Sequence, residues 1–418
     1  MASRDDTRKD AAIKASPSSE SRDPAYFSYY AQFVHQQNML QDNVRTSMYH
    51  SAIIANGPGW FRGKTVMDIG AGSGILSYFA VQAGAEKVYA VEASSMAVRM
   101  RKMLASTGTR NTWMHEKIEV VPSKIEDAEL VQVDTLISEP IGVLLVHERM
   151  IESYLYARDH FLKPGGAMLP SAGTIYLAPF TDANLWTQTM AKVRFWENTN
   201  FFGVDFSPLC RDAKEEIFAQ PVVGCFDHRI LLAPSVSHHV DFRTITIADL
   251  QDIIIPFEWE VPFTGLIHGI AGWFDINLGG FMLSTSPSAE RTHWQQVRFL
   301  LKEPLAVNAY ETIRGWMRLT VNSQRSYDVV AEIVTGKEAL LADPKTTTIQ
   351  SKETEEIDPR LTPGGSGRRQ GKWALHEQCY WYDTGVDYTR PEFLAMYSPD
   401  LLEGSGDGNE MDTQLFSA

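Results

Sequence analysis

The stretch Val66-Met67-Asp68-Ile69-Gly70-Ala71-Gly72-Ser73-Gly74-Ile75 decides the fold of the first half of the chain. A short apolar run, typical of a buried strand, leads into three glycines at alternate positions and then into an apolar segment of helical character. Glycine at such a turn lets the backbone approach a ligand where a Cβ would clash. The stretch therefore predicts a ligand-binding loop at the carboxyl edge of a parallel sheet.

Strand-like and helix-like segments alternate around this loop. We expect strands at 65–69, 87–92, 119–122 and 133–138, and helices at 75–83, 96–106 and 148–161. This alternation is typical of a doubly wound parallel sheet. We therefore predict a Rossmann-like α/β domain at 24–170, which begins with helix at 24–56, and a disordered tail at 1–23.

The pattern changes after Leu162-Lys163-Pro164-Gly165-Gly166, which we interpret as a break. Strand-like segments then dominate, at 174–178, 239–247, 253–261, 266–276, 293–301, 311–321 and 327–333. They predict an all-β domain, either sandwich or barrel, at 171–336. Within it, the helical and aromatic segment 183–216 is expected to dock as an insertion or to reach another subunit. Residues 337–418 are expected to form a partly disordered extension with an aromatic island at 373–388.

Composition limits the possible functions of this 418-residue chain. Three cysteines without a CxxC motif argue for a reducing compartment and against a metal site. A net charge of −14 disfavours direct binding of nucleic acid and suits cationic protein partners, although acidity could also serve solubility alone. No apolar run approaches the length of a membrane-spanning helix, so no membrane association is expected.

Acidic residues after the next two strands suggest which ligand the loop binds. Glu92 ends the second strand, where a carboxylate accepts hydrogen bonds from both ribose hydroxyls. NAD and S-adenosylmethionine both meet this requirement, and the Gly-x-Gly-x-Gly spacing favours S-adenosylmethionine. A tight turn without a ligand is the alternative. Glu126 follows the third strand, where adenine contacts arise, although a solvated loop acid would have the same appearance.

Two glutamates nine residues apart, Glu139 and Glu148, follow the fourth strand. Two carboxylates in apolar surroundings are costly unless a cation lies between them. A planar guanidinium fits best, because each carboxylate can accept two parallel N–H donors. Beside a methyl donor, the pair predicts methyl transfer to an arginine nitrogen. Glu148 could instead cap the following helix.

Taken together, these motifs resemble the protein arginine methyltransferases, and most closely their coactivator-associated type I branch. The resemblance runs from Tyr26 to Ile333. It rests on Tyr26-Phe27-Ser28-Tyr29-Tyr30, the glycine loop, Ala90-Val91-Glu92-Ala93-Ser94, Ser138-Glu139-Pro140 through Glu148-Arg149-Met150, and Thr292-His293-Trp294. It implies a Rossmann-like S-adenosylmethionine-dependent methyltransferase domain followed by a β-barrel, with 183–216 as the helical arm of a head-to-tail homodimer.

The resemblance also implies roles for individual residues. Arg45, a surface arginine by sequence alone, would pair with the methionine carboxylate of the cofactor. His293 would reach Asp42, and Met39 would leave room for two methyl groups on one nitrogen. The implied catalytic residues are Glu139, Glu148, His293, Asp42, Tyr30 and Met39. The implied cofactor-binding residues are Tyr26, Phe27, Gln36, Arg45, Gly70, Gly72, Glu92, Ala93, Lys124, Ile125, Glu126, Glu139 and Ser153.

The implied activity is type I protein arginine N-methylation, giving mono- and asymmetric dimethylarginine. By resemblance, the substrates are histone tails and proteins of RNA processing and transcription, and the protein resides in the nucleus and cytoplasm. Two alternatives remain: a catalytically weak dimeric scaffold, and a methyltransferase for a different guanidino compound. The chain departs from the branch at Asn43, Val143 and His147, where tyrosine, an aromatic residue and asparagine are usual.

Overall fold

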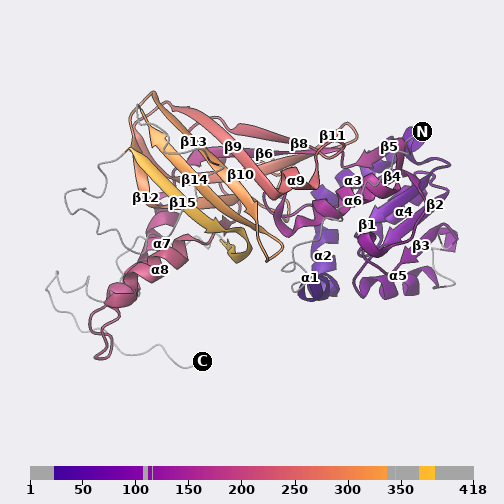
Figure 1. The fold of residues 1–418 in the computed structure, drawn as a ribbon, viewed down its shortest axis with the longest axis horizontal. Helices are drawn as coiled ribbons and strands as arrows, with labels where there is room; N and C mark the ends of the chain where they lie inside the picture. Colours follow the sequence, from indigo (N-terminus) through magenta and orange to yellow (C-terminus); the bar gives the residue numbers. More distant parts are fainter. Residues whose placement is uncertain (1–22, 107–111, 115, 337–343, 345–366, 382–418) are drawn as a thin grey trace, which may run out of the picture.

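The computed structural model describes residues 23–106, 112–114, 116–336, 344 and 367–381. Its parallel sheet and its antiparallel sheets form two bodies that lie end to end in Figure 1. The predictions of disorder for the first 22 residues, and for most of the extension after 336, fall outside the described residues.

The N-terminal domain contains a five-stranded parallel sheet with the order β3-β2-β1-β4-β5. Its strands are β1 (Thr65–Ile69), β2 (Lys87–Val91), β3 (Ile118–Val121), β4 (Val133–Ser138) and β5 (Leu162–Leu169). Its connecting helices are α4 (Ile75–Gln82), α5 (Met96–Leu104) and α6 (Met150–Phe161). The predicted Rossmann-like fold is confirmed, and β1 and β4 have the predicted bounds.

Strand β5 corrects the prediction of a break after Phe161. Val133 of β4 pairs with Leu162, and Thr135 then pairs with Ala167, so the intervening residues of β5 bulge out of the ladder. Because β5 is the edge strand, Pro164 removes no hydrogen bond from the sheet interior. The turn-forming composition therefore belongs to a bulge within a strand.

Three helices precede the sheet and cover most of the segment 24–56 that was predicted as helical: α1 (Asp23–Tyr30), α2 (Phe33–Gln41) and α3 (Asn43–Ala55). Asp42 separates α2 from α3, because its backbone is extended (φ −68°, ψ 92°) and its side chain accepts a hydrogen bond from the backbone N–H of Arg45. Figure 1 shows α1 and α2 at the junction between the two domains. None of the residues of α1 is buried.

The C-terminal domain is built from two sheets, antiparallel except for the β7–β16 pair, that together form the predicted barrel. One has the order β16-β7-β12-β10-β6-β8, with β11 paired to β10, and the other has the order β15-β14-β13-β9. Their strands are β6 (Ala172–Phe180), β7 (Val222–Val223), β8 (Val236–Asp241), β9 (Asp252–Val261), β10 (Gly265–Leu278), β11 (Phe281–Ser284), β12 (Val297–Val307), β13 (Glu311–Val321), β14 (Tyr327–Thr335), β15 (Arg368–Ala374) and β16 (Cys379–Tyr380). Buried and exposed residues alternate along β9, as expected for a strand with one face on a core.

Two predicted strands of this domain are displaced along the sequence, since β8 covers Val236–Asp241 and β12 covers Val297–Val307. The predicted strand at 239–247 ends at Asp241, and Thr246 begins a short helix, α9 (Ile247–Gln251), with a capping box to Asp249. The predicted strand at 293–301 begins only at Val297, so His293 lies in the preceding loop. A loop position leaves the His293 side chain available for contacts with the other domain.

The described part of the C-terminal extension completes the β domain. Strand β15 pairs with β14, and β16 pairs in parallel with β7. The Trp373 side chain is 1% exposed, and its Nε1 donates to the carbonyl oxygen of Leu300 at 3.0 Å. The domain therefore includes residues beyond the predicted boundary at 336.

The segment between β6 and β7 forms an arm that leaves the domain (Figure 1). It contains α7 (Ala183–Arg194) and α8 (Cys210–Phe218), joined by an aromatic tip in which Phe201 contacts Phe195, Phe202 and Phe206. Phe202 is 94% exposed. None of the described helices is long and apolar enough to cross a membrane.

Candidate active site

The predicted site residues follow the carboxyl ends of four neighbouring parallel strands, and helices α1 to α3 and one loop of the β domain approach them. Their positions are Tyr26, Phe27 and Tyr30 on α1; Gln36 and Met39 on α2; Asp42 and Arg45 at the start of α3; Gly70 and Gly72 after β1; Glu92 and Ala93 after β2; Lys124, Ile125 and Glu126 after β3; Glu139 and Glu148 after β4; Ser153 on α6; and His293 before β12.

The glycine loop after β1 lies directly beneath helix α2. Gly72 has φ +55°, and a Cβ built on it would lie 2.9 Å from Oε1 of Gln36. That same oxygen accepts the backbone N–H of Ser73 at 3.0 Å, and Nε2 of Gln36 donates to the carbonyl oxygen of Tyr30 at 2.9 Å. Gln36 therefore ties both the loop and the end of α1 to α2.

Glu92 has a fixed orientation at the end of β2. One carboxylate oxygen accepts the backbone N–H of Gly72 and the other that of Ser94, each at 2.7 Å. Each oxygen can accept further hydrogen bonds, so the buried carboxylate suits the two hydroxyls of a ribose. Glu126 is exposed and accepts a hydrogen bond from the Ser153 hydroxyl at 2.6 Å.

Arg45 and Glu139 form an ion pair at the centre of the site. Nη2 of Arg45 lies 2.9 Å from a carboxylate oxygen of Glu139, and the two side chains are 7% and 11% exposed. Nη1 of Arg45 also donates to the carbonyl oxygen of Met39 at 3.3 Å. The alternative of a surface arginine is therefore wrong, and the partner that the structure gives Arg45 is the first glutamate of the pair.

Glu148 lies outside the helix in which it was predicted. It and Arg149 have left-handed backbone conformations (φ +72° and +57°), and α6 begins only at Met150. No side-chain hydrogen bond caps that helix, so the capping alternative is also wrong. Both carboxylate oxygens of Glu148 instead accept from the Tyr30 hydroxyl, at 2.7 and 2.8 Å.

Burial has a large effect on the ionisation of Glu148. Burial raises the pKa of its carboxyl from 4.5 to about 7, and the negative charge of Glu139 adds to this increase. The hydrogen bond from Tyr30 acts in the opposite direction. The two carboxylates are thus close enough to influence each other, which is the arrangement that a cation between them would relieve.

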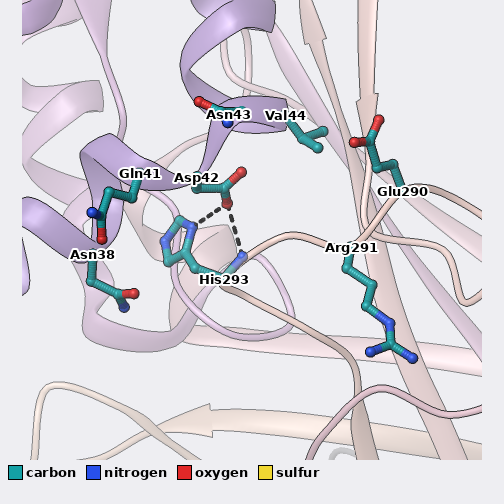
Figure 2. A pocket seen from close by; sticks show the side chains of 8 residues that line it. All are labelled: Asn38, Gln41, Asp42, Asn43, Val44, Glu290, Arg291 and His293. Carbon is teal, nitrogen blue, oxygen red and sulfur yellow. Dashed lines mark hydrogen bonds and ion pairs between the residues drawn. The ribbon is translucent and has the colours of Figure 1, made fainter.

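Asp42 connects the N-terminal helices to the β domain. One oxygen caps α3 by accepting the backbone N–H of Arg45 at 2.9 Å. The other accepts from the backbone N–H of His293 at 2.8 Å and lies 2.7 Å from its Nδ1 (Figure 2). Burial raises the pKa of Asp42, but these hydrogen bonds outweigh burial and hold it below the ordinary value. Beside the pair is an open pocket of about 320 Å³, lined by Asn38, Gln41, Asp42, Asn43, Val44, Glu290, Arg291 and His293.

The sequence interpretation missed some polar residues of the site. Asp68 of β1 is 1% exposed and accepts a hydrogen bond from the Ser77 hydroxyl at 2.7 Å. Burial raises its pKa to about 7. The sequence did contain an indication of Asp68, because it is an acidic residue within an apolar strand and lies just before the glycine loop. The ion pair between Asp23, the first residue of α1, and Arg325 could not be predicted from the sequence, because more than half of the chain separates the two residues.

Comparison with known proteins identifies the family. Histone-arginine methyltransferase CARMER of Drosophila yakuba is 46% identical over 399 residues, which cover 94% of this chain and 73% of that protein. The chain belongs to the protein arginine methyltransferase family. The probable histone-arginine methyltransferase 1.4 of Arabidopsis thaliana is 47% identical over 309 residues, which cover 73% of the chain. The chain spans only 58% of the length of that plant relative.

Two family models match separate parts of this chain. The arginine methyltransferase oligomerization subdomain matches residues 171–334, which carry the β domain and the arm. The model of ribosomal protein L11 methyltransferase (PrmA) matches residues 60–166, which carry the parallel sheet. The predicted division of the fold into a methyltransferase-like sheet and a β domain is consistent with both matches.

Solved structures of arginine methyltransferases share the fold. Arabidopsis thaliana protein arginine methyltransferase 10, in a uniquely open conformation, has a TM-score of 0.69 and 26% identity and covers 84% of this chain and 100% of its own. The Trypanosoma brucei PRMT1 enzyme-prozyme heterotetrameric complex with AdoHcy has a TM-score of 0.66 and 26% identity, covering 82% and 99%. The predicted combination of a Rossmann-like domain and a β-barrel is therefore confirmed.

Proposed function

We propose that this protein is a type I protein arginine N-methyltransferase that transfers methyl groups from S-adenosylmethionine to arginine side chains of proteins, including histone tails. The observation that carries the proposal is the pair Glu139 and Glu148 beside the glycine loop. Each glutamate is held by a hydrogen-bond donor of the N-terminal helices, Arg45 for the first and Tyr30 for the second. The names of the curated relatives support histone arginine as the substrate.

The residues around the glycine loop fit S-adenosylmethionine. Gly72 allows close approach of the ligand, Glu92 offers both carboxylate oxygens to ribose hydroxyls, and Glu126 lies after β3, where an adenine would lie. The related trypanosomal complex was determined with AdoHcy, the demethylated form of this cofactor. When bound, S-adenosylmethionine supplies a methyl group that is already activated by the sulfonium charge.

The chain contributes alignment and charge to the reaction. Glu139 and Glu148 would hold the guanidinium plane in one pose, since each carboxylate can accept two of its N–H donors. They would also draw positive charge toward the nitrogens that they touch, leaving the remaining nitrogen a better nucleophile. Once that nitrogen is methylated, it must lose a proton. Glu148, whose pKa is raised to about 7, is a suitable acceptor near neutral pH.

Other parts of the chain suggest the product, the assembly and the location. Met39, whose carbonyl oxygen is bonded to Arg45, would leave room for a second methyl group on the same nitrogen, giving asymmetric dimethylarginine. The exposed aromatic tip of the arm, within the matched oligomerization subdomain, would bind a second copy to form a homodimer. Histone substrates would place the protein in the nucleus, with a further cytoplasmic pool.

The test is product analysis by mass spectrometry. The purified chain is incubated with S-adenosylmethionine and a histone H3 tail peptide, or with an arginine- and glycine-rich protein, and product arginines are resolved after hydrolysis. We expect asymmetric dimethylarginine from the wild type and almost none from Glu148→Gln. Glu258→Gln, an exposed change on β9, is the matched control and should be fully active.

Each other outcome contradicts a defined part of the proposal. Monomethylarginine or symmetric dimethylarginine as the end product would refute type I specificity. An unchanged product ratio in Met39→Phe would remove Met39 as the residue that sets the number of methyl groups. Absence of any product, despite binding of S-adenosylhomocysteine, would favour the dimeric scaffold.

A further inference from the structure

The hairpin between β13 and β14 approaches the active site from the β domain. Thr320, near the end of β13, pairs with Asp252 at the start of β9, next to α9. Figure 1 shows α9 at the end of the β domain that faces the α/β domain. The hairpin residues Asn322 to Ser326 therefore lie where the two domains meet.

Arg325 of this hairpin binds the first residue of helix α1. Its guanidinium forms an ion pair with Asp23, which also pairs with Lys124 from the loop after β3. The side chains of Asp23 and Arg325 are only 14% and 16% exposed. The Arg325 guanidinium also lies over the ring of Tyr26, 4.5 Å from the ring centroid. A single side chain of the β domain thus contacts α1 at two points.

Helix α1 is held by surface contacts, which besides Arg325 include Lys124 at Asp23 and Gln36 at the carbonyl oxygen of Tyr30. It has eight residues, none of them buried, and a helix of this length is not stable alone. Its aromatic residues connect Arg325 to one of the two glutamates. Tyr26 lies against Tyr30, with ring centroids 4.9 Å apart, and the Tyr30 hydroxyl donates to Glu148 at 2.7 Å. The position of α1 therefore sets the position of the donor that orients Glu148.

The same hairpin contacts the segment that carries Glu148. Nδ1 of His147 lies 2.8 Å from the Ser326 hydroxyl, and Nη1 of Arg149 donates to the carbonyl oxygen of Asn322 at 3.3 Å. These contacts lie on both sides of Glu148, whose left-handed backbone needs support from its neighbours. The hairpin thus contacts both the helix that carries Tyr30 and the residues on either side of Glu148.

We propose that Arg325 is a positioning residue for the arginine-binding glutamates, because it fastens helix α1 to the β domain and so holds Tyr30 against Glu148. This inference rests on the proposed function. It assigns the β13–β14 hairpin a role in the reaction, although none of its residues needs to touch the substrate.

Arg325 also acts on Glu148 through its charge. Burial is the main cause of the raised pKa of Glu148, and the charge of Glu139 adds to it. The hydrogen bonds from Tyr30 and Tyr26 and the positive charge of Arg325 lower it. Removing the cation should therefore raise the pKa of Glu148 and move the acidic limb of the pH–rate profile to higher pH. A contact that neither positioned Tyr30 nor acted on Glu148 through its charge would leave that limb unchanged.

The test uses the full chain with substitutions at both ends of the ion pair. Arg325→Gly removes the side chain and also relieves a left-handed backbone (φ +54°), which offsets part of the stability lost with the ion pair. Arg325→Lys keeps the positive charge but loses the planar guanidinium. Asp23→Asn keeps the size of the side chain that pairs with Arg325 but removes its negative charge. Arg243→Gln is the matched control, because the side chain of Arg243 is 63% exposed and pairs with Asp241, which is not one of the site residues.

Two measurements are made on each variant. Hydrogen–deuterium exchange of residues 24–32 reports the anchoring of α1 without any need for activity. Initial rates with S-adenosylmethionine and a histone H3 tail peptide give kcat/KM against pH. In Arg325→Gly we expect faster exchange in α1, about tenfold lower kcat/KM, and an acidic limb at higher pH. Arg325→Lys should bring the limb back toward the wild-type pH while recovering only part of the rate. Asp23→Asn should show faster exchange with a smaller shift of the limb, because it weakens the Tyr30 hydrogen bond to Glu148 but keeps the Arg325 charge.

The outcomes separate this inference from the proposed function. Unchanged exchange in α1 in both Arg325→Gly and Asp23→Asn would refute the anchoring role, whatever the rates. Faster exchange with wild-type kcat/KM and pH profile would refute the effect on the glutamates. If the wild type made no methylarginine, the proposed function would fail, while the exchange data would still decide whether Arg325 anchors α1.

Discussion

In the proposed methyl transfer, the ionisation of Glu148 should make the rate depend on pH around neutrality. Burial, reinforced by the charge of Glu139, raises the pKa of its carboxyl from 4.5 to about 7. Only the ionised carboxylate can bind a guanidinium tightly and accept its proton. The arginine substrate stays protonated throughout this range, because its own pKa is above ~12. The enzyme group therefore controls the profile, and activity should increase with pH.

The expected increase in activity with pH follows from the pKa of Glu148. With a value of about 7, about one tenth of Glu148 is ionised at pH 6 and about nine tenths at pH 8. The value of kcat/KM, which reports the free enzyme, should therefore rise about tenfold between these pH values. Bound arginine places a cation beside the carboxylate and lowers its pKa. The value of kcat should therefore level off at a lower pH than kcat/KM.

The raised pKa of Glu148 makes the folded protein less stable as the pH rises, whereas it makes the activity increase. The folded-state pKa of Glu148 is higher than its unfolded value of 4.5, so the native state resists ionisation. The contribution of Glu148 to stability is complete below about pH 4.5 and is lost as the pH rises through about 7, a loss of at most about 3 kcal/mol. Asp68 acts in the same direction, because burial raises its pKa to about 7 as well.

Initial rates with a histone H3 tail peptide, and urea unfolding at about pH 5 and 8, test both effects. Glu148→Gln should lose most activity at every pH, and its unfolding free energy should depend less on pH than that of the wild type. A kcat/KM that stays constant between about pH 6 and 8 would show that ionisation of Glu148 is not required, and the reasoning would be refuted.

Three further predictions concern other parts of the molecule. Asp42→Ala removes the cap of α3 and both hydrogen bonds from His293, so urea unfolding should show a loss of about 2 to 3 kcal/mol, whereas Asp42→Asn should retain the cap. Phe202→Asp places a charge on the arm tip and should shift sedimentation from dimer to monomer, whereas the same change at exposed Phe263 should not. Trp373→Ala empties a buried site between the sheets and should cost about 3 to 5 kcal/mol in urea unfolding, and a smaller loss would mean that β15 contributes little to the core.

The sequence alone was sufficient to predict an element when the pattern of its own residues determined where it begins and ends. Strands β1 and β4 have the predicted bounds, because each is a buried apolar run with a clear end. The sequence alone was insufficient when an element depends on the strands that pair with it in space. The proline and glycines of β5 indicate a turn, and only the edge position of the strand makes them compatible with a sheet. Strand β15 is polar and charged, so its pairing with β14 carried no apolar signal.

The site shows the same limit. Glu139, Glu148 and Glu92 could be selected from the sequence, because acids in apolar or strand-end positions are unusual. The partner of Arg45 could not be predicted, since the chain folds α3 onto the loop after β4 from a distance of about ninety residues. The left-handed backbone of Glu148 was also hidden, because this conformation in a glutamate is imposed by surrounding contacts.

The late position of β15 has a consequence for how the protein is made. Strand β14 ends at Thr335, and its neighbour β15 begins only at Arg368. While the ribosome translates the intervening residues, the nascent barrel presents an unpaired strand edge and lacks Trp373 in its core. Open edges invite pairing with other chains. The newly synthesised β domain should therefore need chaperone protection until the last strands emerge, and premature stop codons between β14 and β15 should yield aggregated protein.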